Sequence, residues 1–305
     1  DAPFTPASYA SLLRDGKTKN LNFNWGPGFR VAVGHQWSND WALSLTWLRF
    51  FTKAERHLHA SSGKQLQPVQ LAAVDGFGTL PDETSSLSEP ASGPMFSKAA
   101  AHWYAHLSQL DLILCRPFHV GKWLSLTPYF GLRTTWLQQR LSVNYKNNLV
   151  TSASLTPTDN YDVRKKCSWW GIGPEAGFGI GFDFRGGWSI LGRAAAAIEY
   201  GLHKIKEIDI DTTVAKTGAD GILVDSNDSY RMAHPIFDLQ LALGWDHTFK
   251  EGRYKLRLEG GWEQHVYFSQ NQLPSYYNQT VVGDFISNQG DLAYQGWRFA
   301  VQLDF

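Results

Sequence analysis

A strict alternation of apolar residues with small or polar ones is the feature that most constrains this chain. From Trp170 to Phe184 every second residue is apolar, and the positions between them hold glycine and the carboxylates Glu175 and Asp183. After the turn at 185–187 the alternation resumes. Successive side chains of a strand point to opposite faces, so each arm predicts a strand with one apolar face. Arms of more than a dozen residues exceed ordinary strands and suffice to cross a bilayer at a tilt.

The same hairpin recurs along the chain. Tight turns are expected at 36–40, 117–121, 185–187 and 250–252, and long polar links at roughly 52–98, 146–166, 206–228 and 270–289. Short turns on one side and long loops on the other are typical of bacterial outer-membrane barrels, where the short turns are periplasmic and the long loops extracellular. A soluble β-sandwich is the alternative, but its strands would be shorter. We therefore predict an all-β fold, a transmembrane antiparallel β-barrel of the bacterial outer membrane.

The number of strands poses a problem at the N-terminus. Nine strands can be placed from the alternation, whereas bacterial single-chain barrels have an even number. We expect about ten strands in a barrel domain at 22–305, with the first strand drawn from the N-terminal segment 1–21. That segment alternates poorly, so the alternative is a short helix or plug, with the tenth strand inside 52–98 or 270–289.

Composition agrees with a membrane barrel and excludes several other classes. Aromatic residues make up 14% of the chain, yet mean hydropathy is −0.30, as expected where only every second residue meets lipid. No stretch of about 18 apolar residues exists, so no transmembrane helix is predicted. Lys and Arg total 28 and balance the 28 Asp and Glu. The chain therefore has no excess of positive charge that would indicate nucleic-acid binding.

The C-terminal strand favours the outer membrane of a Gram-negative bacterium, whereas the N-terminus leaves export open. The chain begins Asp1-Ala2-Pro3 without a charged, apolar leader, which is expected of a protein that is never exported or of one whose signal peptide has been removed. The final segment, DLAYQGWRFAVQLDF, alternates back from Phe305. A terminal Phe on an amphipathic strand resembles the signal read by barrel-insertion machinery. We expect that machinery and outer-membrane lipid as partners, and self-association stays open.

The two cysteines are predicted to lie far apart. Cys115 is expected beside a periplasmic turn and Cys167 near the outer end of a strand. At ~3.3 Å per residue and ~40° tilt, these positions differ by tens of ångströms, whereas bridged cysteines need Cα atoms within ~7 Å. We predict no internal disulfide, and a link to another molecule stays open.

Charged residues recur on the face that alternation places inside the barrel. The expected inward, pore-lining residues are Arg30, Asp111, Arg133, Glu175, Asp183, Arg193, Glu199, Asp238, Lys255, Arg257, Glu259, Glu263 and Arg298, accompanied by Asp246 and Asp304. Buried charges require partners or water. Two outcomes compete: a wet lumen that passes small solutes with a slight preference for cations, or a closed ionic network that fills a narrow barrel. Inward glycines at 171, 173, 177, 179 and 181 either clear a passage or make room for curvature and packing across the lumen.

Tryptophans on the apolar faces are expected to form the aromatic girdles at the membrane–water interfaces. They are Trp41, Trp136, Trp170, Trp188, Trp245, Trp262 and Trp297. Carbohydrate-binding platforms are the alternative, and these would require the rings to cluster on the loops.

No constellation in the sequence supports an enzyme. Asp246 and His247 are adjacent in a strand and point to opposite faces. A serine hydrolase could be imagined around His234 and Asp238, but no nucleophile motif supports it. The ten histidines show no metal-ligand spacing, and solvated or paired histidines are the simpler interpretation. We expect no catalytic residues, no metal and no cofactor.

Several motifs resemble one known family. The segments WEQHVYFSQNQ and GDLAYQGWRFAVQLDF near the end, with WGPGFRVAVG, LTPYFGLRTTW and WWGIGPEAGF before them, resemble the Legionella-type pore-forming major outer-membrane proteins across roughly 22–305. The resemblance implies an outer-membrane barrel with a porin-like activity in intracellular-living bacteria. The chain departs from the family near its N-terminus, where an additional aromatic strand is usual, and His265 stands where a Gln is more usual.

The sequence thus leaves two main hypotheses. The first is a porin-like major surface protein that allows passive diffusion of small hydrophilic solutes or ions through a charged lumen. The second is a closed structural barrel that acts as an adhesin or surface antigen through its extracellular loops. An outer-membrane hydrolase is a third and weaker one.

Overall fold

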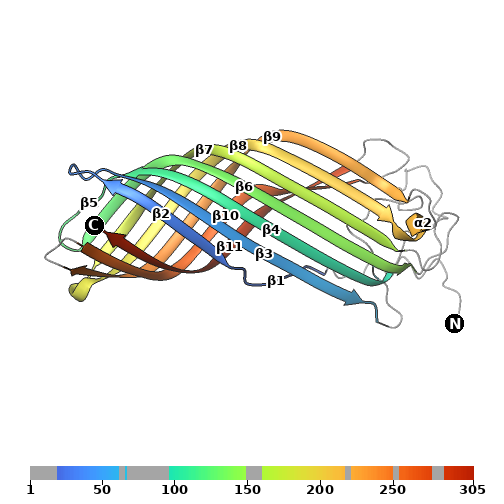
Figure 1. Cartoon of the computed structure of the whole chain (residues 1–305), viewed down its shortest axis with the longest axis horizontal. Helices are drawn as coiled ribbons and strands as arrows, with labels where there is room; N and C mark the ends of the chain where they lie inside the picture. The colour runs from blue at the N-terminus through green and yellow to red at the C-terminus, as the bar shows by residue number, and fades with distance from the viewer. Residues whose placement is uncertain are drawn as a thin grey trace, which may run out of the picture.

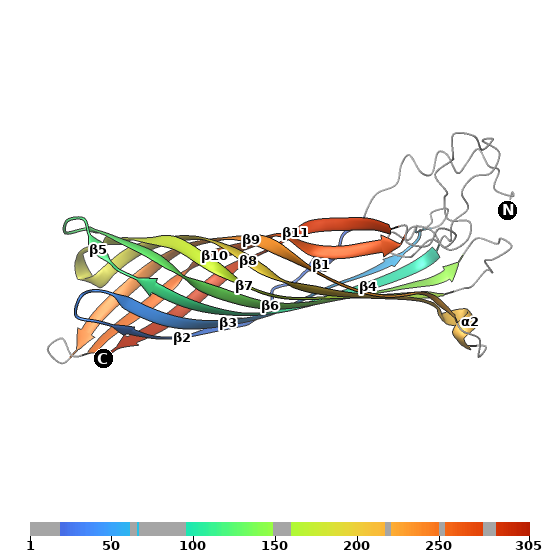
Figure 2. The ribbon, with the colours of Figure 1, turned by 90° about the horizontal axis from the view of Figure 1, so that it is seen from above.

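Most of the chain belongs to one long, rolled β-sheet (Figures 1 and 2). The structure, a computed structural model, describes residues 19–61, 66, 96–148, 160–216, 221–249, 254–276 and 285–305. Its strands are β1 (Asn22–Phe23), β2 (Gly28–Gln36), β3 (Ala42–His59), β4 (Phe96–Cys115), β5 (Phe118–His119), β6 (Leu124–Asn148), β7 (Tyr161–Asp183), β8 (Trp188–Asp211), β9 (Ile222–Phe249), β10 (Tyr254–Tyr276) and β11 (Phe285–Asp304). A 3-10 turn η1 (Arg185–Gly187) and a short helix α2 (Thr212–Lys216) complete the described elements.

The sheet is antiparallel, and neighbouring strands follow one another in sequence. Its order is β1-β3-β4-β6-β7-β8-β9-β10-β11, with β2 also paired to β3 and β5 to β6. The strands cross the long axis of the molecule obliquely (Figure 1). We call the end with η1 and β5 the turn end and the end with α2 the loop end; they lie at the left and right of Figure 1. The all-β, antiparallel prediction is confirmed.

The β7–β8 hairpin shows how local sequence sets a tight turn. Gly186 and Gly187 have φ angles of 81° and 82°, a left-handed conformation that glycine adopts without strain. A Cβ atom on Gly187 would also lie 2.3 Å from the backbone oxygen of Asp246. The turn expected at 185–187 is confirmed. The turn expected at 36–40 is confirmed too, and it lies between the end of β2 at Gln36 and the start of β3 at Ala42. The turn expected at 117–121 is longer and contains β5, and the one at 250–252 lies outside the described residues.

The strands extend further toward the loop end than the sequence predicted. We expected links to begin near residues 52, 146, 206 and 270, but β3, β6, β8 and β10 continue to His59, Asn148, Asp211 and Tyr276. The longest strand, β9, has 28 residues. These boundaries were wrong because alternation continues after the outward face has become polar, and a polar outward face resembles a loop in sequence.

The distribution of polar and apolar residues between the two faces of the sheet changes along the strands. The exchange follows one row of side chains that are paired across four strands, which we call the boundary row: Ser108, Trp136, Trp170 and Leu202. On the turn side of this row the outward face is apolar and the inward face polar. On the loop side the outward face carries more charged and polar residues, and the inward face is apolar on β4 and β6 but holds buried polar groups on β8, such as Glu207 and Asp209. Trp169 and Trp170 mark the exchange in β7, because Trp169 is buried inside and Trp170 is exposed outside.

Apolar side chains pack inside the rolled sheet in three clusters. The cluster nearest the loop end includes Phe96, Trp103, Tyr145, Tyr161 and Val163. The middle cluster takes Leu48, Leu107, Leu137, Trp169, Ala197, Ile236 and Tyr267 from seven neighbouring strands. The third, toward the turn end, contains Ile113, Tyr129 and Ala195. The interior of the described sheet therefore contains a packed core.

The two edges of the sheet approach each other without pairing. Phe50 of β3 stacks on Tyr294 of β11 with 5.0 Å between ring centroids, and Trp25 contacts Trp262 edge-on at 6.5 Å. Among the described residues, however, no backbone ladder joins β11 to β1 or β2. The predicted closed barrel is thus confirmed only as far as a rolled antiparallel sheet.

The direction of the edge strands explains why no ladder forms between them. Both β2 and β11 run toward the turn end (Figure 1), so an antiparallel ladder would need one more strand between them. We expected that strand from 1–21, of which residues 1–18 lie outside the described part. Strand β1 does not supply it, because β1 continues the line of β2 along β3. Nine strands of at least nine residues are described, against the expected ten, and the domain division at residue 21 stays a prediction.

Among the described residues, no helix is long and apolar enough to cross a membrane.

Candidate functional site

The charged interior on the turn side of the boundary row centres on Arg133. Its guanidinium lies 2.9 Å from Asp111, 2.8 Å from Glu175 and 2.6 Å from Asp238, measured between the nearest nitrogen and carboxylate oxygen. The Arg133 side chain is only 4% exposed. These residues come from β4, β6, β7 and β9. One buried cation therefore holds four strands together across the interior, and buried charges of this kind require such partners.

His265 extends this cluster across the interior to the other edge of the sheet. Its Nδ1 lies 2.8 Å from Asp238, and its Nε2 lies 3.6 Å from Glu263. Glu263 in turn accepts a hydrogen bond of 3.0 Å from Arg30 on edge strand β2. The Arg30–Glu263 pair joins β2 to β10, although no backbone ladder does so. Electrostatic contacts thus help to hold the rolled sheet together where its edges meet.

A second group of charges lies nearer the turn end. Arg257 donates two hydrogen bonds to Asp246, of 2.6 and 2.8 Å, and Lys255 lies 3.1 Å from the same carboxylate. Arg298 of β11 donates to Glu259 of β10 at 2.9 Å. These contacts are less buried than those of Arg133, and the Lys255 side chain is 41% exposed. The interior charges therefore become more exposed toward the turn end.

The structure places the predicted inward charges on one face, as alternation implied, but it divides them by environment. Arg133, Asp111, Glu175 and Asp238 form one cluster, and Glu199 is buried beside it, where it accepts a hydrogen bond from Thr135. Arg193 lies over the Tyr129 ring at 5.5 Å. The remaining residues occupy the edge and turn-end pairs described above, or lie exposed at strand ends: Arg30, Lys255, Arg257, Glu259, Glu263, Arg298, Asp183 and Asp304. A pore-lining role for them stays a prediction.

One apolar layer crosses the interior on the loop side of the Arg133 cluster. We use this name for the middle cluster of seven residues, one from each of seven strands. None of the seven is more than 6% exposed. Tyr267 links the layer to the charges, because its hydroxyl donates to Gln109 at 2.7 Å and Gln109 donates to Asp111 at 2.7 Å. The layer is thus packed and buried in the interior of the rolled sheet at its level.

The inward glycines of β7 make room for aromatic rings. A Cβ atom on Gly171 would lie 2.3 Å from the ring of Trp169, and one on Gly177 would lie 2.5 Å from the ring of Tyr129. Between packing across the interior and clearing a passage, these two positions favour packing.

Several residues of the cluster were not recognised as such from the sequence. The alternation of β10 places His265 at an inward position, as expected from the sequence, but its link between Asp238 and Glu263 depends on the roll of the sheet. Gln109 and Tyr267 are neutral and carry no charge signal. Their sequence separation of 158 residues hides their hydrogen bond from any local pattern.

Two histidines and one cysteine lie close together in the described part of the chain, where no group of three or more possible metal ligands occurs. His203 and His234 meet through their Nε2 atoms at 2.5 Å, and the Cys167 sulfur lies 3.7 Å from His203 Nδ1. Cys115 and Cys167 are both free, on β4 and β7.

The tryptophans predicted to form girdles face outward. Trp136, Trp170, Trp188 and Trp297 are each more than 40% exposed, and the partly covered ones are Trp41, Trp245 and Trp262. On β8, outward Trp188 and Tyr200 are twelve residues apart. At ~3.3 Å per residue and ~40° tilt this separation is roughly 30 Å along the axis, close to the ~25 Å band of outer-membrane barrels.

A family model settles the relationship that these features suggest. The model of the Legionella pneumophila major outer membrane protein precursor matches residues 4–305. The chain belongs to this family. The match covers the alternating strands and most of the N-terminal segment, and it places the protein in the outer membrane. No curated protein matches the chain.

Proposed function

We propose that this member of the major outer membrane protein family is a closed barrel that serves at the cell surface as an adhesin or surface antigen. In this proposal the sheet closes fully, the turn end faces the periplasm and the loop end faces outward. The observation that carries it is the apolar layer. Seven buried side chains from seven strands pack against one another in the interior, and in a closed barrel a hydrated ion would have to lose its water to pass between them.

The other interior clusters support closure at further levels. The loop-end cluster with Phe96, Trp103 and Tyr161 forms a second apolar block. Below the apolar layer, Arg133 is paired with three carboxylates, so its charge is held in place rather than offered to a passing ion. Passage would require three successive groups to move.

Single-channel recording in planar bilayers tests the proposal. We expect the folded wild-type protein to be silent and Trp169→Ala to produce conductance steps that grow with salt, because it removes the largest ring of the layer. Trp170→Ala is the matched control, since its ring faces outward one position along the same strand. If the wild type gives conductance steps and Trp169→Ala leaves these steps unchanged, the result would contradict closure.

A porin-like role is the second candidate, favoured by the exposed charges at the turn end. Arg193 and Lys255 face inward there and remain accessible to water, as a vestibule for ions would require. In this candidate small hydrophilic solutes or ions diffuse through, with a slight preference for cations. Glu175→Gln should then shift the reversal potential in a salt gradient, whereas a closed barrel has no current to shift.

We propose outer-membrane lipid as the surroundings and the barrel-insertion machinery as a partner through the strand that ends at Phe305. Self-association is a further proposal without a specific contact behind it. We further propose that the protein has no enzymatic activity, no cofactor and no nucleic-acid partner.

A further inference from the structure

A row of cations crosses the outward face on the loop side of the boundary row. Cross-strand register aligns Lys53, Tyr104, Arg140, Lys166 and Lys206 on strands β3, β4, β6, β7 and β8. All five are exposed. We call this set the cationic row. Four of its five members carry positive charge, in a protein whose overall charge is balanced.

The cationic row is unfavourable for the isolated protein. Arg140 lies directly opposite Lys166, and Lys166 directly opposite Lys206, whereas like charges in directly opposed positions destabilise a sheet. Within the described residues, Lys206 forms one long ion pair of 3.8 Å with Asp225, and no carboxylate lies within 4 Å of Lys53, Arg140 or Lys166. Such an arrangement suits a row of positive charges that meets an anion from outside.

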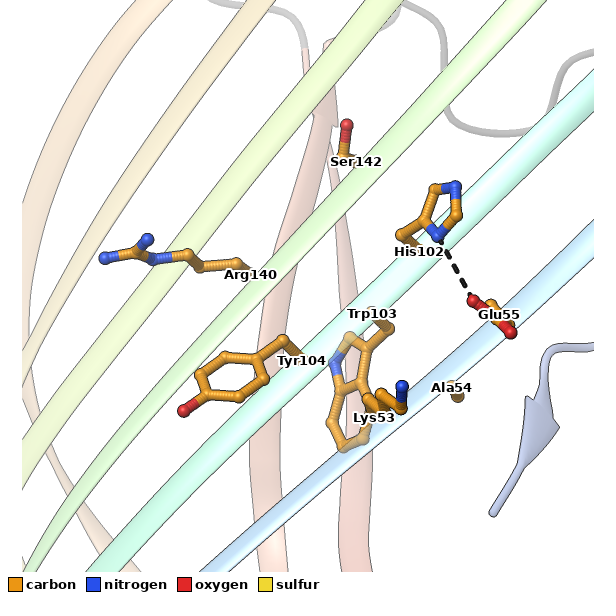
Figure 3. A pocket seen from close by; sticks show the side chains of 8 residues that line it. All are labelled: Lys53, Ala54, Glu55, His102, Trp103, Tyr104, Arg140 and Ser142. Carbon is orange, nitrogen blue, oxygen red and sulfur yellow. Dashed lines mark ion pairs between the residues drawn. The ribbon is translucent and has the colours of Figure 1, made fainter.

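A depression lies at one end of the cationic row (Figure 3). It has a volume of about 310 Å³ and is lined by Lys53, Tyr104, Arg140, His102, Ser142 and Glu55, above Trp103 and Ala54. Glu55 is engaged by His102, whose Nδ1 lies 3.7 Å away. Lys53 and Arg140 therefore flank the Tyr104 ring with their charges free to contact a bound group.

The cationic row lies at the depth of lipid headgroups. Arg140 and Lys166 are each four residues beyond Trp136 and Trp170 on their strands, which is roughly 10 Å along the barrel axis. Headgroup regions begin where such aromatic belts end, and long cationic side chains reach across a distance of this size. Each basic residue near a membrane surface attracts anionic lipid.

We propose that the cationic row binds the phosphate groups of a phosphorylated lipid in the leaflet at the loop end. The Tyr104 depression would receive a headgroup, Arg140 would form paired hydrogen bonds with a phosphate, and Lys166 and Lys206 would extend the contact to neighbouring lipids. The proposal rests on the membrane setting and is independent of whether the interior is closed.

Lipid retention by the detergent-purified full chain tests this proposal. The probes are a bisphosphorylated glycolipid, the same glycolipid without phosphates, and inorganic phosphate alone, and native mass spectrometry measures what stays bound. We expect retention of the phosphorylated lipid only, with at least tenfold weaker binding in the double variant Arg140→Gln/Lys166→Gln because two basic contacts are lost. The matched control, Lys122→Gln/Arg185→Gln, removes equal charge at the turn end and should bind as the wild type does.

Any of three binding results would overturn the proposal: equal retention with and without phosphates, undiminished binding by the double variant, or displacement of the lipid by inorganic phosphate at similar concentration. A stability measurement guards against a folding defect. Lys166→Gln relieves like-charge contacts, so without lipid it should be at least as stable as the wild type, whereas phosphorylated lipid should stabilise the wild type more. Equal stabilisation of both by the lipid would also contradict the proposal. Channel activity has no bearing on either readout, so failure here is distinct from failure of the closed-barrel proposal.

Discussion

On the two sides of the boundary row, the same strands place charged and apolar residues on opposite faces. On the turn side, β6 and β7 present Leu132 and Phe178 outward and Arg133 and Glu175 inward. On the loop side they present Arg140 and Lys166 outward, with buried Leu141 and Val163 inside. The turn half resembles a barrel in lipid, and the loop half resembles a soluble barrel with an apolar core.

The difference indicates that one sheet is stabilised in two ways. In the turn half, we expect lipid to cover the apolar face, while buried ion pairs and hydrogen bonds such as those of Arg133 lie in the interior. In the loop half, burial of apolar side chains such as Phe96 and Tyr161 supplies the stability, as in water. The separation is incomplete, because Lys165 and Glu207 form a buried ion pair of 2.9 Å inside the loop half.

The largest effect is expected from breaking the charge cluster of the turn half. Arg133→Met leaves three carboxylates without their buried cation, so the free energy of unfolding should fall by about 3–5 kcal/mol. Arg164→Met is the control, because Arg164 pairs with Asp162 on the outward loop half with 60% of its side chain exposed, and such pairs contribute about 0–1 kcal/mol. Urea unfolding in detergent or lipid vesicles measures both, and equal losses would remove the distinction between the halves.

A charge placed on the outward face should affect the two halves differently. Leu239→Arg puts a cation on the turn half, where lipid is expected, and should destabilise the protein by about 2–4 kcal/mol in bilayers. Ile208→Arg makes the same change on the loop half, opposite Asp225, and should change stability by less than about 1 kcal/mol. Unfolding titrations in vesicles compare the two, and a similar loss for both would place Ile208 in lipid as well.

A smaller effect is expected where a glycine makes room for the apolar layer. Gly171→Ala forces a methyl group against the Trp169 ring, so we expect a loss of about 1–3 kcal/mol. Gly192→Ala is the control, because a Cβ there meets no atom within 4 Å, and it should be neutral. Thermal unfolding followed by tryptophan fluorescence reports on both variants, and a neutral Gly171→Ala would argue against tight packing of the layer.

The sequence allowed the faces of the turn half to be predicted, because only one arrangement puts apolar side chains into lipid. The inward positions of Arg133, Glu175 and Asp238 follow from alternation alone. Their mutual contacts do not, since these depend on the register of several strands and on how tightly the sheet rolls. The same holds for His265, whose two carboxylate neighbours come from β9 and β10.

The loop half was misjudged for a physical reason. Outward Lys204 and Lys206 ended the apolar pattern of β8, so the strand was predicted to end there. The strand in fact continues to Asp211, with buried Ile205 between outward Lys204 and Lys206 and with Glu207 and Asp209 buried further along. A search for alternation of either sign, rather than for an apolar outward face, would have found these extensions. The apolar layer, assembled from seven strands, has no local signature.

The central claim is that the boundary row marks the limit of the lipid, and one measurement tests it most directly. Single-cysteine spin labels at outward positions 132 and 178 on the turn side, and 140 and 166 on the loop side, can be compared in vesicles by their collision rates with oxygen and with a water-soluble nickel chelate. Cys115 and Cys167 would first be replaced by serine. The account predicts that oxygen dominates at 132 and 178 and the nickel chelate at 140 and 166. Equal access of the nickel chelate at all four positions would contradict it.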